Sequence, residues 1–308
     1  MSLEQFVPAI LTIITAATPL VFAATGELIT EKSGVLNLGV EGMMLTGAVT
    51  GFASVFFFDS AIMACIAAML AGMATALIFA FLVLGLQASQ VATGLALTIF
   101  GVGLSALLGQ NMVGIAYEGL PKLFIPGISE ISVIGPLLFT HDALVYLSLV
   151  LPFAVAWFLY RTRAGLILRA VGDSHDAAHA IGYSVIGIRY LATMFGGAMA
   201  GLAGAYLSLS YSPMWVENMS AGRGWIALAL VVFATWRPWR LFLGAYLFGG
   251  ITILQLHAQA IGINVASQFM SMLPYLVTIL VLVLISRDQN KIKLNAPACI
   301  GKPFHPAA

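Results

Sequence analysis

Residues 61–86 read AIMACIAAMLAGMATALIFAFLVLGL, a stretch that contains no charged side chain. A helix needs about 20 apolar residues to cross the hydrocarbon core of a bilayer, because each residue advances it by about 1.5 Å. A helix also satisfies its own backbone hydrogen bonds, which lipid cannot do. Residues 61–86 therefore predict a transmembrane helix.

Comparable apolar stretches recur along the whole 308-residue chain. They predict an all-α fold, a polytopic membrane helix bundle with about nine transmembrane helices, within a range of about 8–10. Residues 225–256 fit either two short spans or one broken pair. The predicted spans are Phe6–Ala24, Met43–Phe58, Ala61–Leu86, Val91–Leu108, Ala143–Tyr160, Tyr190–Leu209, Trp225–Trp236, Leu241–Leu256 and Phe269–Ser286.

The composition excludes several classes of protein. Hydrophobic residues make up 61% of the chain and charged residues 8%, with a net charge of +1. Soluble domains carry about 25% charged residues, so a soluble enzyme, a nucleic-acid-binding protein and a disordered chain are all excluded. Cys65 and Cys299 lie too far apart in the sequence to suggest a disulfide framework, and we expect two free thiols.

The distribution of basic residues predicts the orientation. Ten of the thirteen Lys and Arg residues fall in residues 161–189, 237–240 and 287–302, segments that an even number of spans separates. Basic loops face the cytoplasm, so we expect these segments to be cytoplasmic, with Lys122 and Arg223 facing outward. The predicted domains are a transmembrane domain, residues 1–286, including a cytoplasmic coupling loop at residues 161–189, and a cytoplasmic tail, residues 287–308. Simple alternation places the N-terminus outside, unless residues 26–42 re-enter the membrane.

Two polar stretches interrupt the apolar helices. Residues 34–42, GVLNLGVEG, place Asn37 and Glu41 among three glycines, which predicts a broken or re-entrant helix beside a polar cavity. A later span contains three uncharged polar residues near its start, Gln90, Thr93 and Thr98. They suggest that this span forms a wall of a neutral, polar substrate path. The alternatives are a glycine-mediated helix contact for the first stretch and hydrogen bonds between helices for the second.

The sequence RAVGDSHDAAHAIG at residues 169–182 predicts a short cytoplasmic helix. Asp173 or Ser174 would cap it and Gly182 would end it. Such a helix is too short to be stable alone, so it docks either on its own membrane domain or on a soluble partner. His175 and His179 stand four residues apart, but no third ligand lies nearby, and a solvated helix face is the favoured reading.

The sequence contains no phosphate-binding loop and no nucleophile elbow. We therefore predict no catalytic residues, no metal site, no cofactor and no enzymatic activity in this chain.

Taken with GRGWIALA at residues 222–229 and LPYLVT at residues 273–278, these stretches resemble the permease subunits of ABC importers. The resemblance is to the branched-chain amino acid, ribose and nucleoside (simple sugar) superfamily, nearest the smaller nucleoside-type permease. It covers nearly the whole chain. Two positions depart from the pattern, Trp225 in place of Phe and Thr98 in place of Asn.

The resemblance implies that the short cytoplasmic helix is the coupling helix. Its sequence is similar to the Glu-Ala-Ala-x-x-x-Gly pattern by which such permeases dock on their ATPases, with Asp in place of Glu. The implied coupling residues are Arg169, Asp173, Asp176, Ala177, Ala178 and Gly182.

The resemblance also implies partners and a location. The partners are an ABC ATPase that hydrolyses ATP, a second permease in a heterodimer, a periplasmic or lipid-anchored substrate-binding protein and membrane lipid, without nucleic acid. The location is the bacterial cytoplasmic (inner) membrane, with a multi-pass chain and a cytoplasmic C-terminus.

The predicted function is a membrane-spanning permease that forms the path for a neutral polar solute, a nucleoside or simple sugar. A branched-chain amino acid ABC permease is an alternative. A stand-alone secondary transporter is less favoured, because it needs an acidic residue deep in a span, whereas Asp59, Asp142 and Glu217 lie at predicted span ends. A membrane enzyme is disfavoured because no acid–base pair converges.

Overall fold

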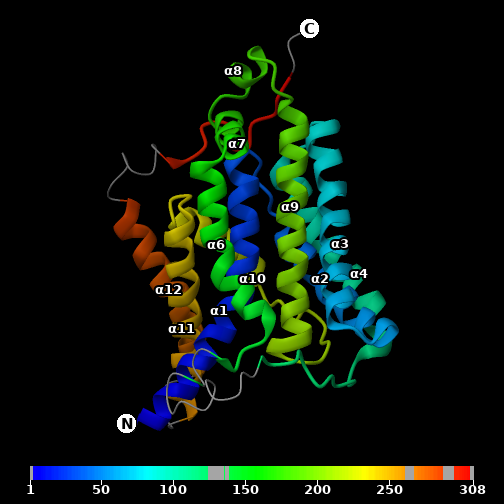
Figure 1. The fold of residues 1–308 in the computed structure, drawn as a ribbon, viewed down its shortest axis with the longest axis vertical. Coiled ribbons are helices and arrows are strands. Elements are labelled where there is room, and N and C mark those ends of the chain that lie inside the picture. Colours follow the sequence, from blue (N-terminus) through cyan, green and yellow to red (C-terminus); the bar gives the residue numbers. More distant parts are fainter. Residues whose placement is uncertain (1–2, 124–134, 136–138, 261–266, 287–294, 306–308) are drawn as a thin grey trace.

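The computed structural model describes residues 3–123, 135, 139–260, 267–286 and 295–305, and these form a bundle of helices (Figure 1). The predicted all-α polytopic bundle is confirmed. Seven described helices are long and apolar enough to cross a membrane, and α10 is shorter, so the predicted number of about nine is approximate. The helices are α1 (Leu3–Lys32), α2 (Val40–Phe58), α3 (Ala61–Ala80), α4 (Gln90–Gly109), α6 (Ala143–Arg161), α7 (Arg163–Asp173), α8 (His175–Ala180), α9 (Val185–Tyr206), α10 (Arg223–Phe233), α11 (Pro238–Ala260) and α12 (Ser267–Ser286).

The two ends of the bundle differ in charge. One end, called here the α8 end, carries α7, α8 and the C-terminal residues, and the N-terminus lies at the other (Figure 1). Arg161, Arg163 and Arg237 also lie at the α8 end, where α6, α7 and the α10–α11 turn meet it. Lys122 lies at the opposite end, beside Asp142 at the start of α6.

Helix α9 is the centre of the packing and contacts α1, α2 and α3. Small residues allow the helix backbones to approach closely. A Cβ atom on Gly201 would meet the carbonyl oxygen of Ala68 in α3, and one on Gly47 in α2 would meet the backbone of Gly201. Small residues are the usual means of close helix packing in membranes, and here they bring α2, α3 and α9 together.

Helix α1 is longer than predicted. The apolar pattern places its end at Ala24, but the helix continues without a break to Lys32. Glu27 and Glu31 are almost completely buried within this extension. The break predicted near residues 34–42 is confined to residues 33–39, and Glu41 lies in the first turn of α2.

Helix α10 has 11 residues and is therefore about 16 Å long, roughly half of a hydrocarbon core. The chain reaches it through residues 212–222, which are not helical, and it begins within the bundle beside Glu41. Helix α11 has 23 residues. Residues 225–256 therefore belong to one short helix and one helix of full length.

Candidate functional site

The first candidate site is the non-helical linker of residues 33–39, between α1 and α2. Side chains of α4 hold it in place. The Leu36 N–H donates to Gln90 Oε1 at 2.7 Å, and the Thr98 hydroxyl donates to the Leu38 carbonyl at 3.0 Å. Asn37 turns the linker itself, because its Oδ1 accepts the Gly39 N–H at 3.0 Å. Backbone without helical bonds survives in a membrane only when protein satisfies it, and these side chains do so.

Two acidic residues of α1 are buried near its end, and one of them supports the same linker. Glu27 is fully buried, and its Oε1 accepts the Asn37 N–H at 3.2 Å. Its Oε2 has no hydrogen-bond partner among the described residues. Glu31 accepts a hydrogen bond from the indole Nε1–H of Trp236 at 2.5 Å. We did not predict either carboxylate as a site residue, although two acids four residues apart in an apolar helix are a signal that could have identified them.

Glu41 lies where two helices begin. Its Oε1 accepts the Ser220 hydroxyl at 2.5 Å and the Gly222 N–H at 2.7 Å, and its Oε2 accepts the Gly224 N–H at 2.6 Å. Glu41 belongs to the first turn of α2, while Gly222 is the N-cap of α10. Helix N-termini favour negative charge, so one buried carboxylate stabilises the starts of both helices.

The structure thus brings together most of the residues predicted to line a substrate path. Asn37, Gln90 and Thr98 converge on the linker, and Glu41 lies at the α2–α10 junction that follows it. Thr93 is half-buried in α4 and makes none of these bonds to the linker. The hydrogen bonds of the other four residues go mainly to the backbone of this chain, which gives them a structural role.

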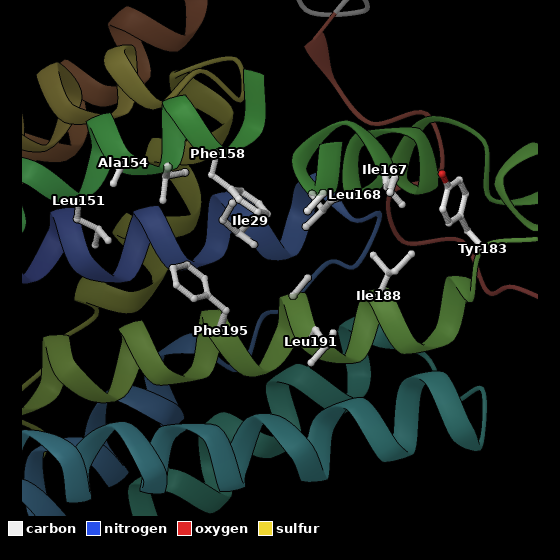
Figure 2. Close-up of a pocket in the computed structure, with 13 residues that line it drawn as sticks. Ile29, Leu151, Ala154, Phe158, Ile167, Leu168, Tyr183, Ile188, Leu191 and Phe195 are labelled. Atoms are coloured by element: carbon white, nitrogen blue, oxygen red, sulfur yellow. The ribbon is translucent and has the colours of Figure 1, made fainter. Parts of the chain in front are cut away.

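One cavity among the described residues is lined by apolar side chains. Figure 2 shows it between α1, α6, α7 and α9, with a volume of about 630 Å³ and walls that include Ile29, Phe158, Leu168 and Phe195. Three cavities with more polar walls measure about 150, 190 and 160 Å³. Pockets for small ligands are usually about 300–1,000 Å³, and each of these three polar cavities is smaller than that.

The second candidate site is α8, which projects from the bundle beyond α7 (Figure 1). Ser174 caps it by accepting the Ala177 N–H at 3.4 Å, and Gly182 follows it in the left-handed conformation, with φ of 91°. Both features agree with the predicted cap and end. The helix has six residues, and its next residue, Ile181, is 71% exposed.

The predicted coupling residues occupy different environments. Asp173, Asp176, Ala177 and Gly182 are exposed, whereas Ala178 is buried against the bundle. Arg169 is half-buried in α7, where its Nε–H donates to the Leu159 carbonyl at 3.0 Å and its guanidinium lies 5.1 Å from the centre of the Tyr160 ring. Arg169 therefore fixes α7 to the end of α6, and the exposed face of α8 is the part that is free to meet another protein.

Sequence reasoning did not identify the residues that cover the inner face of α8. Phe304 is 7% exposed, and its ring centre lies 5.2 Å from that of His175 and 5.3 Å from that of His179. Arg189 of α9 donates to the Ser33 and Lys302 carbonyls, each at 3.1 Å. A charge in the first turns of a membrane helix was a usable signal for Arg189, but no local pattern marks Phe304.

His175 is neutral in this arrangement. Arg189 Nη2 lies 3.3 Å from His175 Nδ1, and a guanidinium only donates hydrogen bonds, so Nδ1 accepts and the proton resides on Nε2. His175 Nε2 lies 3.6 Å from Asp176 Oδ1. Burial, and then the charge of Arg189, lower the pKa of His175 below its ordinary value.

Comparison with known proteins places the chain among transport proteins. The family model described as "Branched-chain amino acid transport system / permease component" matches residues 9–283. A putative glucose ABC transporter permease protein, TsgC13 of Haloferax volcanii, is 40% identical, and the alignment covers 94% of this chain and 95% of that protein.

Two further relatives are named for nucleosides. The guanosine ABC transporter permease protein NupQ of Bacillus subtilis is 32% identical, over 94% of this chain and 93% of its own length. The nucleoside ABC transporter permease protein NupC of Lactococcus lactis is 32% identical, over 87% of this chain and 89% of its own. No solved structure gives a significant match.

Proposed function

Because the chain belongs to the family of branched-chain amino acid transport system permease components, and is the membrane permease subunit of an ABC importer, we propose that a separate ATPase drives it by binding α8. The observation that carries this proposal is the exposed face of α8, formed by Asp176, Ala177, Ala180 and Ile181. A helix of six residues is not stable by itself, and a partner that covers this face would stabilise it.

The cavities support a second permease subunit. The three polar cavities within this chain are each smaller than a typical ligand pocket. Larger walls for a polar solute could come from another membrane subunit, and we propose that two permeases form the path between them, as a heterodimer. A periplasmic or lipid-anchored binding protein would deliver the solute.

The proposed solute is a neutral polar molecule, a simple sugar or nucleoside. The relatives named above are permeases for glucose, guanosine and nucleosides. Two of the buried acids support an uncharged cargo, because Glu31 and Glu41 accept hydrogen bonds from protein donors. The alternative is a branched-chain amino acid, which the family description supports, and competition by unlabelled leucine during uptake would separate the two.

The proposed orientation places the α8 end in the cytoplasm. Arg161, Arg163, Arg237 and Arg240 gather at this end, and basic segments next to membrane helices stay on the cytoplasmic side. The C-terminal residues 295–305 would then be cytoplasmic, and the membrane would be the inner membrane of a bacterial cell.

Co-purification with the ATPase tests the docking proposal. Ile181→Asp places a charge on the exposed face of α8, and we expect the amount of bound ATPase to fall about tenfold or more, as when a central interface residue is lost. Ile115→Asp is the matched control, because Ile115 is also exposed but lies in the loop at the opposite end. Equal ATPase binding by both variants would exclude α8 as the docking site.

A further inference from the structure

The C-terminal segment, residues 295–305, lies across the α8 end and joins elements that are distant in sequence. The Cys299 N–H donates to the Gly172 carbonyl in α7 at 2.9 Å. The Gly301 N–H donates to the Gly34 carbonyl in the α1–α2 linker at 3.1 Å. One short segment is thus bonded both to the helix before α8 and to the linker that holds the buried polar cluster.

Long side chains from three other parts of the bundle bind the carbonyls of the same segment. Lys32 Nζ donates to the Asn295 carbonyl at 2.6 Å, Arg189 Nη1 to the Lys302 carbonyl at 3.1 Å, and Gln87 Nε2 to the Phe304 carbonyl at 3.2 Å. These donors come from the end of α1, from α9 and from the connection between α3 and α4. Bonds from charged donors are stronger than neutral ones, so the segment is held firmly on the bundle.

Phe304 is the contact between this segment and α8. It forms a small buried cluster with Val171 of α7, Ala178 of α8 and Val185 at the start of α9. Ala178 is the buried residue of α8, and the rings of His175 and His179 flank Phe304 from the same helix. The inner face of α8 therefore rests partly on the C-terminal segment.

This support matters mechanically because α8 is short and non-helical residues bound it at both ends. Ser174 precedes it in an extended conformation, and Gly182 follows it with a positive φ. If the inner face were unsupported, movement of a protein bound to the outer face would swing α8 about these ends. Packed side chains and hydrogen bonds are the means by which movement at one site reaches another.

We propose that the C-terminal segment is a rigid connector that transmits movement of α8 to the α1–α2 linker, with Phe304 as the positioning residue. This inference rests on the proposed docking of an ATPase at α8. The path runs from α8 through Phe304 and the backbone of residues 299–302 to Gly34 and Ser33. From there the linker carries it to Asn37 and the start of α2.

The test uses the complete complex of both permeases and the ATPase in proteoliposomes, with the substrate-binding protein present. Uptake of radiolabelled guanosine or glucose and ATP hydrolysis are measured together. Phe304→Ala leaves the exposed face of α8 intact, so we expect the ATPase to remain bound and to hydrolyse ATP. Uptake per ATP hydrolysed should fall about fivefold or more, the lower range of coupling between sites. Phe304→Tyr should keep the normal uptake per ATP hydrolysed, because the aromatic contact with both histidines is kept.

Hydrogen exchange of the α8 amides provides a second readout. Faster exchange at residues 175–182 in Phe304→Ala, with unchanged exchange in α9, is the expected result. His305→Ala is the matched control, since His305 is the exposed neighbour of Phe304. If Phe304→Ala reduces the amount of assembled complex, Phe304→Leu is used in its place. We expect uptake per ATP hydrolysed to fall in Phe304→Leu as well, but by less than in Phe304→Ala.

The outcomes separate this inference from the proposed function. An unchanged ratio of uptake to hydrolysis in both the Ala and Leu variants would overturn the connector. Loss of the ratio in Phe304→Tyr to the same extent as in Phe304→Ala would also overturn it. Failure of the unaltered chain to bind the ATPase would instead overturn docking at α8, whatever the Phe304 variants do.

Discussion

Glu41 joins two helices whose first residues are far apart in the sequence. Its carboxylate accepts hydrogen bonds from Ser220, Gly222 and Gly224 while it belongs to the first turn of α2. A short helix that begins inside a membrane has unsatisfied N–H groups, and Glu41 supplies the acceptors. Glu41 thus explains how α10 can begin inside the bundle.

Replacing Glu41 by Gln tests this role. The amide group cannot accept both backbone N–H groups and the Ser220 hydroxyl as the carboxylate does, so a buried donor loses its acceptor. We expect the free energy of unfolding to fall by about 1–3 kcal/mol, measured as a lower midpoint of thermal unfolding in detergent. Glu118→Gln, in an exposed loop, is the control. Equal midpoints for the two variants would contradict the capping role.

His175 gives α8 a dependence on pH. The groups that face it are the Arg189 guanidinium, the Asp176 carboxylate, Lys302 and the ring of Phe304. Its pKa is lowered in the folded protein, so the folded protein binds fewer protons than the unfolded chain as the pH falls below about 6.5. The packing of α8 is therefore fully stable above that pH and weakens below it.

Hydrogen exchange of residues 175–182 between pH 7.5 and pH 5.5, corrected for the intrinsic pH dependence of exchange, measures this weakening. We expect protection to decrease toward the acidic end, because a protonated Nδ1 would face the Arg189 guanidinium. His175→Gln keeps an acceptor without a titratable proton, so its protection should not change with pH. A parallel loss of protection in the variant would assign the effect to another group.

At the scale of the element, close packing between helices explains where small residues stand. A Cβ atom on Gly204 of α9 would meet the carbonyl oxygen of Met44 in α2, and backbone cannot move aside as a flexible side chain can. Gly103 of α4 is exposed, and a Cβ atom there would meet nothing within 4 Å. The same substitution should therefore have opposite effects at the two sites.

Gly204→Ala should lower the free energy of unfolding by about 1–3 kcal/mol through overpacking. Gly103→Ala should raise it by about 0.5–1 kcal/mol, because alanine favours a helix over glycine. Thermal unfolding of the two purified variants in the same detergent measures the difference. A destabilised Gly103→Ala together with an unaffected Gly204→Ala would contradict the packing described here.

The apolar runs predicted the spans because lipid forces a helix wherever about 20 apolar residues follow one another. The cap and end of α8 were predictable for a similar reason, since Ser174 and Gly182 act on backbone close by. The end of α1 was predicted too early, because Glu27 and Glu31 accept hydrogen bonds from Asn37 and Trp236, and such partners leave no local signal.

The candidate sites were predictable to a smaller extent. Asn37, Gln90 and Thr98 were identified from their polarity, and the structure brings them together. Their partners are mainly backbone atoms of this chain. These partners depend on how α4 packs beside the linker. The position of Phe304 under α8 likewise depends on contacts between residues over a hundred positions apart in the sequence, as in the bond from Arg189 to Lys302.

At the scale of the whole molecule, docking of a cytoplasmic ATPase on α8 requires one orientation of the chain in the membrane. Arg163 lies at the α8 end and Glu118 at the opposite end, and both are exposed. Cysteines at these positions, in a chain with Cys65 and Cys299 replaced by Ser, should react on opposite sides of the membrane. A membrane-impermeant thiol reagent added to right-side-out vesicles should label Glu118→Cys and spare Arg163→Cys. The reverse pattern would contradict a cytoplasmic α8.

We propose that ATP hydrolysed by another protein drives this permease through α8. Uptake of radiolabelled guanosine or glucose into proteoliposomes tests it most directly, with the complete complex compared with this chain alone and with the Ile181→Asp complex. We expect uptake that requires ATP, the ATPase and an unaltered α8. Uptake by this chain alone without nucleotide, or full uptake by the Ile181→Asp complex, would contradict it.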